Sequence, residues 1–128
     1  MQPTHHGDTW TIDDSYNGNP DGARVAIEFL SQLKGHRRVY VTPGLVEVGS
    51  AAEAVHTQIG LELASSVDVV VLVENSATPF IAEGLKAGDF KGDILWYEDG
   101  LSCLNAIPQI TKPGDVVLLQ NDWSDNYA

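Results

Sequence analysis

The sequence has little sulfur and little positive charge, and each shortage excludes a class of protein. Cys103 is the single cysteine among 128 residues, which excludes an internal disulfide and a metal site built from several cysteines. We expect the adjacent His5 and His6 to belong to a frayed terminus, because neighbouring side chains of an extended chain diverge and do not share a metal ion. The sequence contains seven basic and eighteen acidic residues, which give a net charge of −11. Duplex nucleic acid needs clustered basic side chains, so we expect no nucleic-acid partner.

Long apolar runs and the common glycine motifs of nucleotide-binding proteins are also missing. No apolar stretch approaches the roughly 20 residues that a membrane span needs, so no membrane partner is expected. The first ten residues, MQPTHHGDTW, lack the basic start and apolar stretch of a secretory signal, which predicts a cytoplasmic location. Neither G-x-G-x-x-G nor the phosphate loop G-x-x-x-x-G-K-[ST] occurs. Any triphosphate cradle therefore lies on another polypeptide segment.

Five short runs of apolar or alternating residues predict β-strands. They cover residues 9–13, 38–42, 67–73, 93–97 and 115–120. The run at 67–73 is the longest and is rich in valine, which is typical of a central strand of a parallel sheet with helices on each side.

Helical windows separate these runs. Asn19 and Pro20 form an N-cap and a first helical residue for a helix that we expect to end at Gly35. Ser50 and Glu53 predict a capping box at the start of a second helix, which runs to about residue 65.

Two shorter helices are expected at residues 79–86 and 101–107. Strands that alternate with helices in this way predict a single α/β domain. Its sheet is expected to be Rossmann-like, doubly wound and mainly parallel, with five to six strands and helices on both faces.

The stretch IDDSYNGNPDG, residues 12–22, gathers polar side chains between the first strand and the first helix. In an open parallel sheet, ligands bind beyond the carboxyl ends of the strands. The helix that follows also points free N–H groups and a positive dipole end into this space. Asp14 and Asn19 are therefore candidates for ligand binding. The simpler interpretation is that they only make the hydrogen bonds of a turn and a helix cap, and both interpretations stay open.

A phosphoacceptor receiver domain also carries paired acidic residues after its first strand, where they hold a magnesium ion. It additionally requires an acceptor aspartate at the end of the third strand and a lysine after the fifth. The corresponding ends in this sequence are Glu74-Asn75 and Gln120-Asn121. These residues argue against a receiver.

Two motifs, DDSYNGNP at residues 13–20 and TPGLVEVGSAAEAVH at residues 42–56, resemble the C-terminal domain of the Mur ligases. The branch that adds D-alanyl-D-alanine is the most similar, and the resemblance covers residues 11 to about 120. It implies an ATP-dependent amide ligase in peptidoglycan precursor synthesis. In that family the N-terminal domain binds the UDP-muramyl-peptide, the central domain carries the phosphate loop, and the C-terminal domain closes over the nucleotide.

The resemblance implies that this chain is inactive alone, and that ATP and Mg²⁺ are bound by the complete enzyme and not by this chain. Asp14 and Asn17 match positions that face the ribose and base of adenosine, and a carboxylate suits ribose hydroxyl donors. Tyr16 is implied on the adenine side. Asn19 either contributes there or serves only as the helix cap.

The resemblance further implies an acceptor-side or docking surface that includes Glu47, His56 and Asn121. For Glu47 and His56 the simpler interpretation is a loop before a helix, with the histidine on the surface. Two departures from the family leave the acceptor open, whether amino acid or dipeptide. Residues 120–128, QNDWSDNYA, replace a basic segment, and Thr42-Pro43 stands where Gly-Asp is commoner.

A second function of another class stays open, namely a stand-alone Rossmann-like binding or interaction module without catalysis. Continuation of the reading frame upstream into a G-K-[ST] loop would favour the ligase. An enzyme complete within these residues is disfavoured. Cys103 lies in a helical window without a catalytic partner, and no Ser-His-Asp order stands out.

Overall fold

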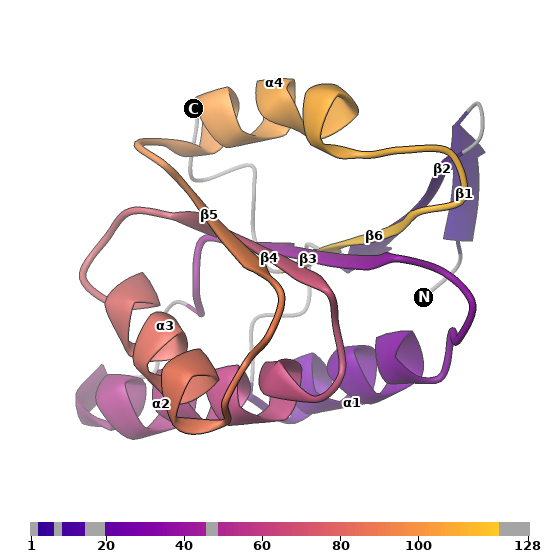
Figure 1. The fold of residues 1–128 in the computed structure, drawn as a ribbon. Coiled ribbons are helices and arrows are strands. Elements are labelled where there is room, and N and C mark those ends of the chain that lie inside the picture. The colour runs from indigo at the N-terminus through magenta and orange to yellow at the C-terminus, as the bar shows by residue number, and fades with distance from the viewer. Residues whose placement is uncertain (1–2, 7–8, 15–19, 46–48, 121–128) are drawn as a thin grey trace.

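The computed structural model describes residues 3–6, 9–14, 20–45 and 49–120. Six strands form one sheet in the order β1-β2-β6-β3-β4-β5, with helices on both faces (Figure 1). The elements are β1 (Pro3–His6), β2 (Thr9–Asp14), α1 (Pro20–Ser31), β3 (Arg38–Thr42), the 3₁₀ turn η1 (Gly49–Ala51), α2 (Ala52–Ala64), β4 (Val69–Val73), α3 (Thr78–Ala87), β5 (Asp93–Tyr97), α4 (Gly100–Ile110) and β6 (Val116–Gln120).

The arrangement confirms the predicted doubly wound α/β fold. Strands β2 to β6 run parallel to one another, and only β1 is antiparallel, against β2. Helices α1, α2 and α3 cover one face of the sheet and α4 covers the other (Figure 1). The valine-rich strand β4 pairs on both sides and is buried throughout, as expected of an interior strand. It lies one strand in from the β5 edge, while β6 and β3 occupy the middle.

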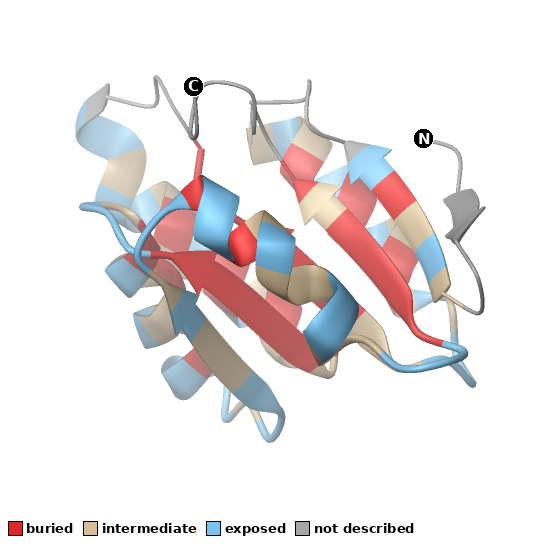
Figure 2. Cartoon of the chain, turned by 90° about the horizontal axis from the view of Figure 1, so that it is seen from above, coloured by how far each residue is buried: buried red, intermediate tan, exposed pale blue. Residues whose placement is uncertain are grey.

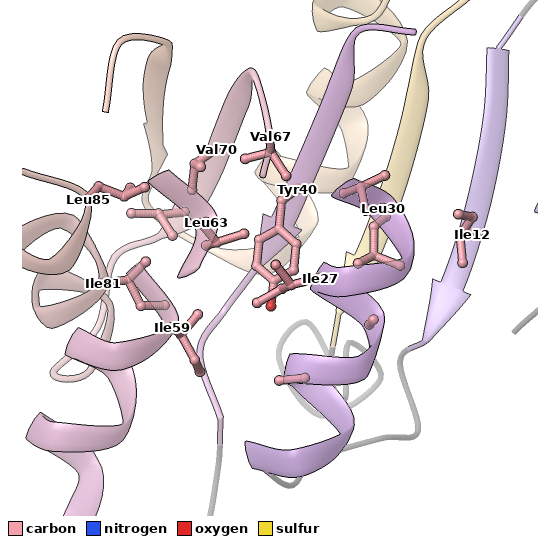
Figure 3. Packing of buried hydrophobic residues seen from close by; sticks show 14 of the residues in the cluster. Ile12, Ile27, Leu30, Tyr40, Ile59, Leu63, Val67, Val70, Ile81 and Leu85 are labelled. Carbon is pink, nitrogen blue, oxygen red and sulfur yellow. The ribbon is translucent and has the colours of Figure 1, made fainter. Parts of the chain in front are cut away.

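The core is divided by the sheet into two clusters. On the face covered by α1 to α3, Tyr40 packs among aliphatic side chains of the strands and helices, including Ile27, Leu30 and Leu63 (Figure 3). On the other face, α4 packs Cys103 against the valines of β3, β4 and β6. Buried positions fill the middle strands almost completely (Figure 2). Each large aliphatic side chain buried in this way contributes roughly 1.5–3 kcal/mol.

Ion pairs hold the amino ends of the middle strands together. The guanidinium of Arg37 donates from Nε and Nη2 to Asp115, with a shortest N–O distance of 3.1 Å, and also donates to the carbonyl of Ile110. Asp115 is buried, and its carboxylate accepts a further bond from the Lys112 N–H. Such a buried carboxylate requires these partners because an unpaired charge is costly to desolvate.

Two helix boundaries differ from the predictions. Helix α1 ends at Ser31, four residues before Gly35, because the chain tightens there through i to i+3 bonds from Gln32 to Phe29 and from Leu33 to Leu30. The capping box expected at Ser50 and Glu53 is wrong. Helix α2 begins after a 3₁₀ turn, and its N-cap, Ala51, makes no side-chain cap bond.

Two further expectations about local structure are corrected. Helix α4 continues through Pro108 to Ile110 instead of stopping near 107, since a proline near a C-terminus costs few helical bonds and Thr111 N–H still reaches the Ile107 carbonyl. The expectation that His5 and His6 belong to a frayed terminus is wrong, because both lie in β1, opposite Trp10 and Thr9 of β2.

Candidate functional site

The carboxyl ends of the five parallel strands meet at one edge of the sheet, where the sequence predicts ligand binding. Strand β2 ends at Asp14, which is in register with Gln120 at the end of β6. Strand β3 ends beside them at Thr42, in register with Leu72 of β4. The backbone of Asp14 is thus placed at the predicted edge, while its side chain lies outside the description.

Most of the predicted site residues lie outside the described part of the chain. These are Tyr16, Asn17 and Asn19 on the nucleotide side, and Glu47 and Asn121 on the acceptor side. Helix α1 does begin at Pro20, as its sequence predicts. The first turn of α1 therefore starts at the carboxyl edge of the sheet, beside the end of β2.

A buried polar pair underlies this edge. Tyr40 Oη on β3 donates to Gln120 Oε1 on β6 at 3.2 Å, and both side chains are almost completely buried. A buried amide and phenol remain stable in the core only when hydrogen-bonded. The pair therefore fixes the end of β6 to β3, next to the strand that carries Asp14.

The chain that leaves β3, residues 42–45, is a buried loop whose backbone groups bind side chains from several elements. Thr42 Oγ1 accepts the Gly44 N–H at 3.0 Å, and the Asn75 side-chain amide donates to the Pro43 carbonyl. Gly44 has a φ of +88°, and a Cβ there would lie 3.1 Å from the His56 ring. Glycine is thus required both by the backbone conformation and by the close approach of the imidazole.

His56 is completely buried, so the expectation of a surface histidine is wrong. Its Nε2 accepts the Leu45 N–H at 2.9 Å, and its Nδ1 lies 2.6 Å from the Ala52 carbonyl. Because a carbonyl can only accept, Nδ1 carries the proton and the ring is the neutral Nδ1–H tautomer. Both ring nitrogens are therefore committed to the backbone of this chain.

Asn75 links the ends of β3 and β4 to the start of α3. Its Oδ1 accepts the N–H groups of Ala77 and Thr78, while Thr78 Oγ1 donates to the Val73 carbonyl at 2.7 Å. These bonds supply partners to the free N–H groups at the start of the helix. Asn75 was not predicted as a site residue, although an asparagine three residues before Thr-Pro is a recognisable helix-start signal.

Two cavities of the described residues bear on the location of the site. A groove of about 220 Å³ lies between the first half of α1 and α2, lined among others by Pro20, Val55 and Gln58. The Arg24 Nε and a Glu62 carboxylate oxygen lie 3.5 Å apart along it. A larger cavity of about 570 Å³, on the α4 side of β2, contains none of the predicted site residues.

Two shifted pKa values mark α4, and neither indicates catalysis. Asp99 caps the helix by accepting the Ser102 N–H at 2.7 Å, and this bond lowers the pKa of its carboxyl group. Burial, and secondarily the charge of Asp99, raises the pKa of the Cys103 thiol to about 12. A nucleophilic cysteine requires a lowered pKa and access to solvent, so Cys103 is a core residue.

The described residues contain no group of three or more histidine, cysteine or acidic side chains that could hold a metal ion. None of the helices in the same part of the chain has the length and apolarity needed to span a bilayer.

A comparison with known protein families matches residues 1–120 to the family model described as "Mur ligase, glutamate ligase domain". Among curated relatives, the UDP-N-acetylmuramoyl-tripeptide--D-alanyl-D-alanine ligase of Mycobacterium tuberculosis (strain CDC 1551 / Oshkosh) is 33% identical over 141 residues, with 94% of this chain covered. The Bacillus subtilis (strain 168) protein of the same name is 26% identical over 110 residues and covers 85% of the chain. The chain spans only 28% and 24% of these two relatives.

Solved structures show the same fold. A MurF ligase from Thermotoga maritima, in complex with ADP, superposes with a TM-score of 0.76 at 22% identity, covering 95% of this chain and 27% of that one. MurF from Acinetobacter baumannii gives a TM-score of 0.73 at 25% identity, covering 94% of this chain and 26% of that one.

Proposed function

Because the chain belongs to the family of the Mur ligase glutamate ligase domain, we propose that it forms the C-terminal domain of an ATP-dependent amide ligase of peptidoglycan precursor synthesis. The observation that carries the proposal is the family match over residues 1–120. Relatives named as ligases that add D-alanyl-D-alanine support it. The reaction class is that of an ADP-forming ligase joining an acid to an amino acid or dipeptide.

The proposal divides the work between this domain and others. The chain corresponds to about a quarter of the length of its curated relatives. We treat residues 1–128 as a single domain and assign the UDP-muramyl-peptide site to an N-terminal domain and the phosphate loop to a central domain. Those two domains are its proposed partners, and we place the reaction in the cytoplasm.

The reaction proceeds in two steps. A carboxylate oxygen of the peptide takes the terminal phosphoryl group of ATP, which leaves an acyl phosphate and ADP. The amine nitrogen of the acceptor then attacks the acyl carbon, the bond from that carbon to the phosphate oxygen breaks, and the amine loses a proton. Water competes with the amine for the acyl phosphate, so closure of a domain over the site protects the intermediate.

On the nucleotide side we assign Asp14 and Asn17 to the ribose and base of ATP, with Tyr16 on the adenine side. Asn19 either joins them or only caps α1. The position of β2 supports these assignments, because its end and the start of α1 at Pro20 both lie at the carboxyl edge of the sheet. The ligase from Thermotoga maritima that was solved in complex with ADP contains a domain with the same fold as this chain.

The phosphates and Mg²⁺ are assigned to the complete enzyme. The sequence contains no phosphate loop, and the described residues bring together no set of metal ligands. We assign no step of this domain's action to Mg²⁺. Its contribution is to bind one side of the adenosine and to exclude water.

On the acceptor side we assign Glu47, His56 and Asn121. His56 is buried and cannot touch a substrate directly, so its effect must pass through the backbone that it holds. Residues 120–128 lack the basic segment of the D-alanyl-D-alanine-adding branch. Experiment must therefore decide whether the acceptor is a dipeptide or a single amino acid.

Amide-bond formation by the complete ligase, measured with UDP-muramyl-peptide, Mg-ATP and a panel of amino acids and D-alanyl-D-alanine, tests the proposal. We expect ADP release to depend on one acceptor and to match amide formation in amount. A protein that forms no amide with any acceptor, yet binds a ligand or partner, would instead support the stand-alone binding module.

A further inference from the structure

The His56 ring joins two points of the backbone that are separated along the chain but bracket one segment. Leu45, which binds Nε2, precedes residues 46–51, and Ala52, which binds Nδ1, follows them. The imidazole therefore closes the base of the connection between β3 and α2. A single side chain holds both ends of this connection in one geometry.

The bond from the Leu45 N–H to His56 has no substitute within a regular element. The Leu45 N–H belongs to a buried loop outside any strand or helix, and Leu45 itself is 5% exposed. A buried N–H that loses its acceptor keeps the full cost of desolvation. The histidine therefore determines the course of the chain at Leu45, and does more than fill space in the core.

The same loop is fixed from two other directions. Thr42 Oγ1 holds Gly44 from β3, and Asn75 holds the Pro43 carbonyl from the turn before α3. Side chains from β3, from α2 and from the turn before α3 thus converge on three consecutive residues, 43–45, at the carboxyl edge of the sheet. Because this loop is buried, its backbone groups depend on these side chains for their hydrogen bonds.

We propose that His56 is a positioning residue of the ligase, whose neutral ring holds the backbone at Leu45 and Ala52 and thereby fixes the acceptor-side end of β3 for catalysis. The proposal rests on the proposed function of the domain. It concerns the backbone that His56 holds, and assigns the ring no contact with substrate.

Two substitutions separate the two bonds. Glutamine places its amide near the position of Nε2 and can still accept from the Leu45 N–H. Asparagine places its amide near Nδ1 and can still donate to the Ala52 carbonyl. His56→Gln and His56→Asn thus form a matched pair of similar polarity that differ in which end of the connection they retain.

Nuclear magnetic resonance of the 128-residue chain tests the bonds themselves. We expect the ¹⁵N shifts of the wild-type ring to report the neutral Nδ1–H tautomer, and the Leu45 amide to exchange slowly with solvent. His56→Gln should preserve the slow exchange of Leu45 and His56→Asn should lose it. A doubly protonated or Nε2–H ring, or a Leu45 amide that exchanges at the same rate in both variants, would overturn the proposal.

Kinetics of the complete ligase test the positioning role. We expect His56→Asn to raise the KM for the acceptor, or lower kcat, by about tenfold or more with the KM for ATP unchanged, since small misplacements cost large factors in rate. His56→Gln should recover most of this loss. Asp115→Asn, which disrupts an ion pair at the opposite edge of the sheet, controls for destabilisation and should leave the acceptor KM unchanged.

These experiments distinguish a failure of the positioning role of His56 from a failure of the proposed ligase function. A wild-type ligase that forms no amide would overturn the function and the positioning role together, while amide exchange at Leu45 would still decide whether His56 holds the loop. An active ligase in which both His56 variants behave alike, or in which Asp115→Asn reproduces the His56→Asn defect, would overturn only the positioning role.

Discussion

Gly60 of α2 and Gly84 of α3 lie face to face, so that the two helices touch backbone to backbone. A Cβ on Gly60 would lie 2.1 Å from the Ile81 carbonyl oxygen, and a Cβ on Gly84 would lie 2.1 Å from that of Thr57. No side-chain rotation relieves such contacts, because the obstructing atoms belong to the main chain. The close crossing of α2 and α3 therefore depends on glycine at both positions.

We expect Gly60→Ala and Gly84→Ala each to lower the free energy of unfolding by about 3 kcal/mol or more, at the upper end of the range for overpacked cores. Urea denaturation of the chain measures this. Gly35→Ala is the control, because Gly35 has a φ of +90° but open space around it. It should cost only about 1–2 kcal/mol through backbone strain. Equal losses in all three variants would contradict the close helix crossing.

The ion pair between Arg37 and Asp115 gives a second prediction. Asp115→Ala should destabilise the chain by about 2–4 kcal/mol, because it leaves Arg37 and the Lys112 N–H without their carboxylate. Lys91→Ala is the matched control, since the Asp89–Lys91 pair is exposed on both sides, and it should change stability by less than about 0.5 kcal/mol. Similar losses in both variants would refute the structural role of the buried pair.

The raised pKa of Cys103 predicts a thiol that does not react in the folded chain. Its folded pKa of about 12 lies above the ordinary value of 9.0, so the folded state keeps a proton that the unfolded state releases. The contribution to stability is complete below pH 9 and is lost as the pH rises from 9 towards 12. A thiol reagent at pH 8 should modify Cys103 only after denaturant is added, and Cys103→Ala should remove the part of the alkaline loss of stability that the thiol contributes. Rapid modification of the native chain would contradict its burial.

Most of the fold follows from local patterns in the sequence. Apolar runs and helix-start signals predict the five parallel strands and the helices, because these signals depend only on neighbouring residues. Strand β1 was missed, although just two residues, Gly7-Asp8, separate it from β2, a spacing and composition typical of a hairpin. The segment was instead predicted to be a frayed terminus, because its four residues are short and polar and show no apolar alternation.

The site was harder to predict, and His56 shows why. It lies three, four and seven residues before Ile59, Gly60 and Leu63, on the buried stripe of α2, so helical spacing alone predicts its burial. Its partner at Leu45 could not be predicted, and neither could the bond between Asn75 and Pro43, 32 residues apart. Such bonds depend on how the sheet brings distant loops together.

Asp14 gives a prediction that separates a functional carboxylate from a structural one. If it faces the ribose only in the closed ligase, Asp14→Ala should change the unfolding free energy of the chain by less than about 0.5 kcal/mol. In the complete ligase the same change should raise the ATP requirement, since a charge-assisted hydrogen bond contributes roughly 1.5–3 kcal/mol. The reverse pattern, with lost stability and unchanged ATP kinetics, would assign Asp14 to the turn.

The central claim is that this domain supplies one side of a nucleotide site whose phosphate loop lies elsewhere in the ligase. Calorimetric titration of Mg-ATP into the 128-residue chain tests it most directly. We expect a dissociation constant of millimolar order or weaker, equivalent to roughly −4 kcal/mol or less in magnitude, and no hydrolysis. A micromolar dissociation constant would contradict the claim, because it would show a complete nucleotide site within these residues.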